Sequence, residues 1–211
     1  MKRLLLALGF LALLLMAATP AKADTIQINV TGISLIYTPF LGTGNLCDAG
    51  GCSVAPLAFN FASSTSVISM DFLVNGVSVG VLNNPPSTLA TDFRVPVGVL
   101  GATPTSGTGG FWDLASSGGG WGLATNITSW NAVVLGGTIL FTGGASVIYA
   151  QNLPFGITVQ NPITWSFTCG NFDGATCTGG TATFTSVPEP GTLVLLGAGL
   201  LGLAGLRRKL S

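Results

Sequence analysis

The side chains that carry most enzyme chemistry are scarce in this chain, and their types exclude the common catalytic arrangements. The sequence has no histidine, which excludes Ser-His-Asp triads, Cys-His pairs and zinc sites built on histidine. Residues 24–187 contain no lysine, so a lysine nucleophile or Schiff base is excluded as well. No G-x-x-x-x-G-K-S/T loop is present to hold a phosphate. The remaining candidates are carboxylates, thiols and aromatic side chains.

The carboxylates show no obvious catalytic pair. A glycoside hydrolase uses two carboxyl groups, one of which acts as the acid. Here the internal aspartates would have to supply both, because no glutamate lies among them: Asp48, Asp71, Asp92, Asp113 and Asp173. Asp92 and Arg94 lie two residues apart on one strand face, which favours a surface ion pair. We expect no enzyme activity, and an aspartate-dependent secreted hydrolase remains the enzymatic alternative.

Two tryptophans in a Gly/Ser-rich segment are candidates for ligand binding. Trp112 and Trp121, with Asp113 beside the first, would form a platform on which sugar rings stack. The competing interpretation is that both indoles fill the core, as aromatic side chains often do. The segment therefore gives one alternative function, that of a carbohydrate-binding module.

The four cysteines fall into two close pairs, Cys47-x4-Cys52 and Cys169-x7-Cys177. In an exported chain such pairs indicate disulfides. Pairing within each pair is the simplest of three connectivities, and each short loop would contribute about 2–3 kcal/mol. A zinc site that uses all four thiolates is the alternative, although neither spacing is typical of a zinc ribbon.

The loop between the second pair of cysteines holds oxygen-bearing side chains ahead of a glycine. Asn171-Phe172-Asp173-Gly174 resembles half of a calcium loop, but Asn, Asp and Gly are also ordinary turn residues. The complete calcium-binding pattern is absent. We expect no metal and no cofactor.

The formal net charge of zero hides an asymmetry between the body of the chain and its ends. Six of the seven basic residues lie within the first 22 or the last five residues. Between them only Arg94 is basic, against six aspartates, which gives the body a net charge of −5. Such a body lacks the basic surface that binds nucleic acid or anionic lipid.

The N-terminus has the three regions of a secretory signal peptide. Met1-Lys2-Arg3 is basic, residues 4–18 are apolar, and Ala21-Lys22-Ala23 provides a small-x-small cleavage pattern. The mature chain would then begin at Asp24. The alternative is an N-terminal anchor that is not cleaved.

The C-terminal 25 residues have three parts in a fixed order. Val187-Pro188-Glu189-Pro190 is a stiff, non-helical strip, because proline fixes its own φ and restricts the residue before it. Residues 192–206 are uncharged and would form a helix of roughly 22 Å, against about 30 Å of membrane hydrocarbon. Arg207-Arg208-Lys209 would hold the end of this helix on the cytoplasmic side, which leaves the body outside.

This order of Pro-Glu-Pro, short apolar helix and basic end resembles the PEP-CTERM sorting signal of bacteria that produce exopolysaccharide. The resemblance covers residues 187–211 only. It implies that exosortase, a membrane-embedded cysteine protease, recognises Val187, Pro188, Glu189 and Pro190 and removes the tail. Tails of this kind are also named ice-binding protein C-terminal domains, a name that does not imply ice binding.

The sequence therefore divides into a signal peptide at 1–23, a folded body at 24–186 and a sorting signal at 187–211. The body is rich in Gly, Thr, Ser, Asn and Val, which favours strands and turns over helices. Around ten short strands predict an all-β fold. We expect an antiparallel β-sandwich, jelly-roll-like, flanked by an N-terminal signal helix and a C-terminal transmembrane helix.

Two strand predictions rest on glycines. Residues 25–31 alternate strictly, and a bulge at Gly32 would carry the apolar face on to Tyr37. Asn75-Gly76 is a preferred type I′ dipeptide, and a two-residue turn there predicts a hairpin over 67–82. Its register would place six apolar side chains on one face. They are Met70, Phe72, Val74, Val77, Val79 and Val81.

The remaining strands are predicted from alternation and breaks. Pro96 would place the strand at 92–99 at an edge of the sheet or at a bulge, because proline cannot donate to the ladder. Further strands are expected near 121–128, 132–141, 145–151, 163–168 and 181–186. Gly136-Gly137 and Gly143-Gly144 would be bends between them.

Together these observations predict an exported protein of the envelope or extracellular matrix, with a structural or adhesive role in biofilm or exopolysaccharide. Its partners would be exosortase, the export machinery and exopolysaccharide, and not nucleic acid. Before processing, the C-terminal helix would tether it to the inner membrane with its body in the periplasm. Afterwards it would lie at the cell surface or outside the cell.

Overall fold

A computed structural model describes residues 24–38, 45–48, 65–84, 89–97, 100–116 and 120–186, which belong to one compact unit. These residues form strands almost throughout. The elements are β1 Ile26–Thr38, β2 Asn45–Asp48, β3 Thr65–Ser66, β4 Ser69–Val74, β5 Val77–Asn83, β6 Leu89–Pro96, β7 Thr105–Gly107, β8 Phe111–Ser116, β9 Gly122–Leu135, β10 Thr138–Gln151, the 3-10 helix η1 Pro154–Gly156, β11 Ile163–Cys169 and β12 Thr176–Ser186. Within this part of the chain no helix has the length and apolar character to span a bilayer. The predicted signal peptide (1–23) and the predicted transmembrane helix (192–206) lie outside the described residues.

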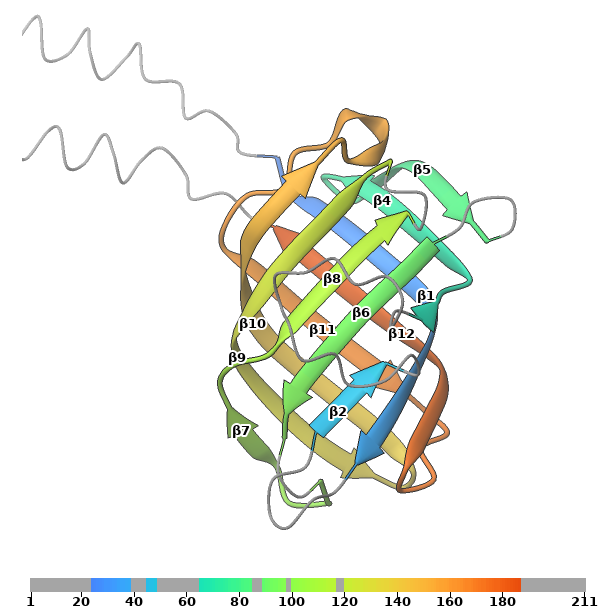
Figure 1. The fold of residues 1–211 in the computed structure, drawn as a ribbon, viewed down its shortest axis with the longest axis vertical. Coiled ribbons are helices and arrows are strands. Elements are labelled where there is room, and N and C mark those ends of the chain that lie inside the picture. The colour runs from blue at the N-terminus through green and yellow to red at the C-terminus, as the bar shows by residue number, and fades with distance from the viewer. Residues whose placement is uncertain are drawn as a thin grey trace, which may run out of the picture. The chain divides into compact units, whose positions relative to one another are not determined.

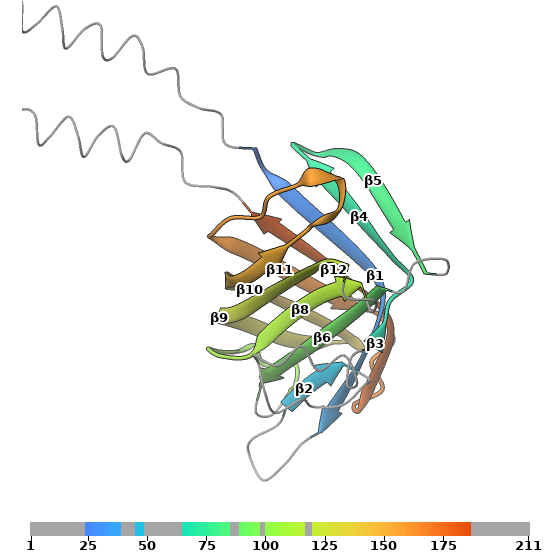
Figure 2. The same cartoon turned by 45° about the horizontal axis from the view of Figure 1, so that its top comes forward.

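The strands form one antiparallel sheet that closes on itself. Neighbours follow the order β12-β11-β10-β9-β8-β6-β2-β1, and β1 pairs in turn with β12. β6 and β8 form one wall, and β11 and β12 face them from the other (Figure 1, Figure 2). Closure gives each strand of this ring a hydrogen-bonded partner on both sides. The prediction of an all-β, antiparallel fold is confirmed, and the two facing walls are sandwich-like; the jelly-roll assignment is not confirmed.

β1 is the branch point of the sheet, and its bulge is the predicted one. Residues 26–31 pair with β4 and residues 35–38 with β2, while β12 runs along the opposite edge of β1. The register with β12 shifts between Thr31 and Ile33, and Gly32 between them has a φ of +81°. Alternate side chains from Ile26 to Tyr37 are buried on both sides of this bulge. Gly32 is needed because a Cβ there would lie 2.3 Å from Ile68.

The β4–β5 hairpin has the predicted turn but not the predicted register. Asn75 and Gly76 both have positive φ, and Val74 pairs with Val77. Phe72 pairs with Gly80 rather than with Val79, because the register shifts between Phe72 and Leu73. A one-residue shift reverses the faces of every later side chain. The predicted single apolar face is therefore wrong. Val77 comes before the shift and keeps its partner Val74, yet it is 68% exposed; Val79 and Val81, at and beyond the shift, are 43% and 49% exposed.

The physical reason for this shift is an aromatic ring from another part of the chain. Phe155 in η1 packs with its centroid 5.6 Å from that of Phe72. A Cβ on Gly80 would lie 2.3 Å from the Phe155 ring. The bulge brings a glycine opposite Phe72, which leaves the space that the Phe155 ring occupies.

β6 shows the predicted alternation but lies inside the sheet. Phe93, Val95 and Val97 are buried, as expected. β6 pairs with β8 on one side and with β2 and β3 on the other, so the predicted edge position is wrong. Pro96 is compatible with an interior strand because it is the last residue of β6.

β9 and β10 form one long hairpin in place of the three strands predicted between 121 and 151. Gly136 and Gly137 make the turn, with φ of +54° and +79°. Gly143 and Gly144 do not separate two strands; they lie within β10 beside a register shift between Gly144 and Ala145. β11 and β12 lie where the last two strands were expected, although β12 begins earlier, at Thr176.

Candidate functional site

The predicted sugar platform is wrong for Trp112, because this indole is completely buried. Its exposed fraction is 0%. The ring centroid lies 4.4 Å from that of Phe93 and 4.7 Å from that of Phe184, on strands from opposite walls. Residues 111–116 form β8 rather than a loop, and β8 directs Trp112 into the interior. The core interpretation of this tryptophan is the correct one.

Two buried threonines hold Trp112 in place. The indole Nε1–H donates to Thr91 Oγ1 at 2.7 Å, and the Thr91 hydroxyl donates to the carbonyl of Asp113 at 3.1 Å. On the other side, Thr125 Oγ1 donates to the carbonyl of Trp112 at 2.6 Å. Both threonines are 0% exposed, so this network satisfies polar groups that water cannot reach. Threonine within an apolar alternation is the sequence signal that could have identified them.

The other two residues of the predicted platform are not brought together with Trp112. Trp121 is half-buried and packs edge-on against Phe72, with centroids 5.9 Å apart. Asp113 follows Trp112 on β8, so its side chain points to the opposite face of the sheet. Asp113 is also the cross-strand partner of Asp92, and its Oδ1 accepts the N–H of Thr125 at 3.1 Å.

The described aspartate side chains accept hydrogen bonds at separate places. Asp24 accepts from the amide of Asn75, and Asp71 from the hydroxyl of Ser78 at 2.6 Å. Asp113 and Asp173 accept from β9 and β12 respectively. The side chains of Asp48 and Asp92 lie outside the described ones. No group of three His, Cys, Asp or Glu side chains that could hold a metal occurs in the part of the chain that the structure describes.

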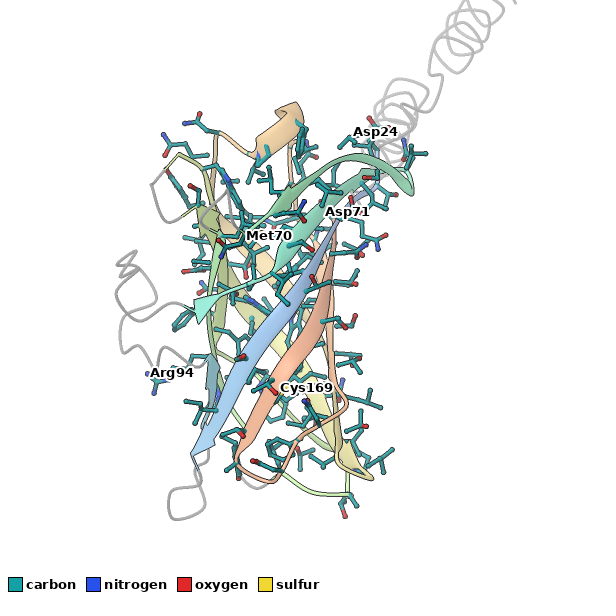
Figure 3. All side chains as sticks on the ribbon, turned by 90° about the vertical axis from the view of Figure 1, so that its right-hand side faces the viewer. Asp24, Met70, Asp71, Arg94 and Cys169 are labelled. Atoms are coloured by element: carbon teal, nitrogen blue, oxygen red, sulfur yellow. A yellow bond between two sulfur atoms is a disulfide. The ribbon has the colours of Figure 1, made fainter. Side chains whose placement is uncertain are left out.

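The predicted disulfide between Cys169 and Cys177 is confirmed, with Cα atoms 6.2 Å apart. It joins the end of β11 to the start of β12, in the half of the domain away from Asp24 (Figure 3). Because these two sulfurs are bonded to each other, a zinc site that uses all four thiolates is excluded. Cys47 belongs to β2, but its side chain and Cys52 lie outside what the structure describes, so the pairing Cys47–Cys52 stays a prediction.

Asp173 organises the loop that the disulfide closes. Its carboxylate accepts the backbone N–H of Thr176 at 2.6 Å, the N–H of Ala175 at 2.8 Å and the Thr176 hydroxyl at 2.8 Å. These three hydrogen bonds, the one from the Thr176 N–H foremost, lower the pKa of Asp173 below its ordinary value. The carboxylate therefore has the turn-forming role that Asp commonly takes.

A groove lies on the outer face of the sheet, across β9, β10, β11 and β12. Its volume is about 550 Å³, within the range of about 300–1,000 Å³ for ligand sites. The strands alternate there, with core side chains such as Trp130, Phe141 and Phe167 directed inward and small polar residues directed outward. We call this hollow the outer hydroxyl groove.

The outward residues of the groove form two rows that cross the strands. Cross-strand partners define the first row as Asn131, Thr142, Ser166 and Thr183. The second row is Ser129, Gly144, Thr164 and Thr185. Neighbouring members lie on adjacent strands, about 4.8 Å apart in the hydrogen-bonding direction.

Two glycines shape the middle of the groove. Gly144 faces outward, where a Cβ would lie 3.0 Å from Thr128 Oγ1 and 3.1 Å from Ser129 Oγ. Its N–H donates to Ser129 Oγ at 3.2 Å. Gly143 faces inward, where a Cβ would lie 2.2 Å from the carbonyl oxygen of Ser129 and 2.8 Å from the Trp165 ring. The floor of the groove is thus bare backbone over a core tryptophan.

The groove was not predicted, although part of its signal is visible in the sequence. Thr164 and Ser166 alternate with core residues on one strand, and Thr183 and Thr185 do so on the next. A sequence pattern shows that such residues share a face. It does not show that β9 and β10 bring Ser129 and Thr142 beside them.

The predicted processing residues lie outside the described residues. These are the cleavage-site alanines Ala21 and Ala23, the recognition residues Val187, Pro188, Glu189 and Pro190, and the basic end Arg207, Arg208 and Lys209. Their roles stay predictions.

Comparison with known proteins gives a family match at the C-terminal end of the chain. The model of the PEP-CTERM protein-sorting motif matches residues 186–209. No curated protein and no solved structure matches the chain. The match confirms the resemblance, which is limited to this segment. The chain therefore carries a PEP-CTERM sorting motif, which implies an exported protein that is sorted and processed by exosortase.

Proposed function

We propose that the chain is an exported structural or adhesive protein of the cell envelope or extracellular matrix, without enzymatic activity. The observation that carries this proposal is the sorting motif at residues 186–209, since it implies that the folded body is delivered outward. The character of the body supports it: a closed sheet, a disulfide and a buried threonine network make a rigid module suited to a passive role.

The route follows from the motif and the two ends of the sequence. The export machinery moves the body across the inner membrane, and the C-terminal helix tethers it there with the body in the periplasm. Exosortase then releases the chain to the cell surface or the extracellular matrix. The partner in that matrix is exopolysaccharide.

The surface composition fits a matrix of sugar polymers. Between residues 24 and 187 a single basic residue and six aspartates supply all the charge. Solubility therefore depends on hydroxyl and amide groups, which can exchange hydrogen bonds with a polysaccharide. No observation favours the aspartate-dependent hydrolase in the same way, because the described aspartates are engaged in structural hydrogen bonds.

The test is fractionation of the native cells that express the wild-type chain or Pro188→Ala/Pro190→Ala. The wild-type chain is expected in the surface and matrix fractions without its tail. The variant, with its recognition strip altered, is expected to stay in the inner membrane at full length. Pro104→Ala, at an exposed proline of the body, is the control and should behave as the wild type. A wild-type chain that stays in the cytosol would refute the proposal.

A further inference from the structure

We infer that the outer hydroxyl groove binds a neutral glycan chain that lies across strands β9–β12. This inference rests on the proposed function, because it names the matrix component that the exported body would contact. It uses residues that differ from the tryptophan platform, of which Trp112 is buried.

The two rows of the groove present groups that match the hydrogen-bonding character of a sugar. One row presents an amide and three hydroxyls, and the other presents three hydroxyls around a glycine. A hydroxyl both donates and accepts hydrogen bonds, and so does a primary amide. Sugar hydroxyls have the same dual character, so a glycan can pair with either row without a unique donor–acceptor pattern.

The residues that line the groove, all of which the structure describes, carry no charge. A cationic ligand would find no carboxylate there. An anionic polymer would approach a body of net charge −5 and would be repelled. The lining therefore selects a ligand with many hydroxyls and no charge.

The floor of the outer hydroxyl groove is shaped by two glycines. Gly144 removes a side chain from the middle of the second row, and Gly143 lies beside it. A chain laid across the strands can therefore approach the backbone at this point. The β sheet and the Trp165 ring below hold the floor rigid, which reduces the entropy lost on binding. Here the indole Nε1–H of Trp165 donates to the carbonyl of Gly144 at 3.3 Å.

The experiment compares two pairs of cross-strand threonines on the same two strands. Thr164 and Thr185 are partners inside the groove, while Thr168 and Thr181 are partners on the same outer face but outside it. The full chain in detergent is titrated with cellohexaose, mannohexaose and soluble dextran, and with alginate as the anionic polymer. Calorimetry or ligand-observed NMR gives the dissociation constants.

At least one neutral glycan is expected to bind, and Thr164→Ala/Thr185→Ala is expected to weaken its binding roughly tenfold through two lost hydrogen bonds. Thr168→Ala/Thr181→Ala is expected to bind as the wild type. Three results would overturn the inference: no binding by any neutral glycan, equal weakening in both variants, or alginate as the preferred ligand. Circular dichroism and thermal unfolding verify that both variants are folded.

Failure of this inference and failure of the proposed function give different results. If the groove does not bind glycan, the wild-type chain still reaches the surface fraction in its processed form. If the proposed function is wrong, the chain is absent from that fraction whatever the groove binds.

Discussion

Thr183 donates a hydrogen bond from Oγ1 to the amide oxygen of Asn29, at 3.0 Å across the seam where β12 meets β1. This contact joins the last strand of the sheet to the first, on the outer face. It also continues the first row of the outer hydroxyl groove onto β1, because Thr183 is a member of that row. The sheet thus closes at β1 and β12, and β12 also carries two residues of the groove, Thr183 and Thr185.

The hydrogen bond from Trp112 to Thr91 makes the core sensitive to a nearly isosteric change. Thr91→Val leaves the buried indole N–H without its acceptor and should lower the free energy of unfolding by about 1–3 kcal/mol. Urea unfolding monitored by tryptophan fluorescence measures the loss. Thr168→Val, at an exposed strand position, is the control and should change stability by about 0.5 kcal/mol or less. Equal losses in both variants would contradict the proposed role of Thr91.

Adjacent glycines in β10 should respond differently to the same substitution. Gly143→Ala forces a Cβ against a backbone oxygen and the Trp165 ring, which should cost about 1–3 kcal/mol of stability. Gly144→Ala meets two hydroxyl groups that can rotate away, so its cost should be smaller. Thermal unfolding of the two variants under one buffer compares them directly. A larger loss for Gly144→Ala would show that the strand does not pack as described.

The disulfide should contribute measurably to stability although the loop is short. Cys169→Ala/Cys177→Ala removes the cross-link between β11 and β12, and we expect a loss of about 2–3 kcal/mol in the free energy of unfolding. Denaturant titration of the oxidised wild type and the double variant provides the comparison. Unchanged stability would mean that the β11–β12 ladder alone holds this end of the sheet.

Acid should loosen the loop that Asp173 organises. The pKa of Asp173 is lowered in the folded state, chiefly by the Thr176 N–H, so ionisation favours the folded loop above the ordinary aspartate pKa of about 3.9. This contribution is lost as the pH falls through the folded-state pKa. The protection of the Ala175 and Thr176 amides, measured as the exchange rate relative to the intrinsic rate at the same pH, should therefore fall in acid. Asp173→Asn should exchange fast already at neutral pH; equally slow exchange in that variant would refute the role.

The local elements of this fold were predictable because short-range patterns determine them. The alternation of Ile163, Trp165 and Phe167 predicted β11, and Asn75-Gly76 predicted the turn of the β4–β5 hairpin. Gly32 marked the bulge in β1. In each case the residues that determine the geometry lie within a few positions of one another.

The errors arose where a distant residue decides the outcome. Phe155 occupies the space beside Gly80 and shifts the hairpin register, and nothing in the hairpin sequence reveals that ring. Trp112 is buried because β8 packs its side chain against Phe93 and Phe184. Closure through β1 and β12 is likewise a property of strands far apart in sequence.

From the sorting motif and the predicted signal peptide we expect that the chain is cut at both ends and that its body is delivered outward. Intact-mass analysis of the protein recovered from its native surface reads both termini and the disulfides together. We expect a chain that begins at Asp24, lacks Arg207-Arg208-Lys209 and has its cysteines oxidised. A full-length chain of 211 residues in the cytosol, with reduced thiols, would contradict it.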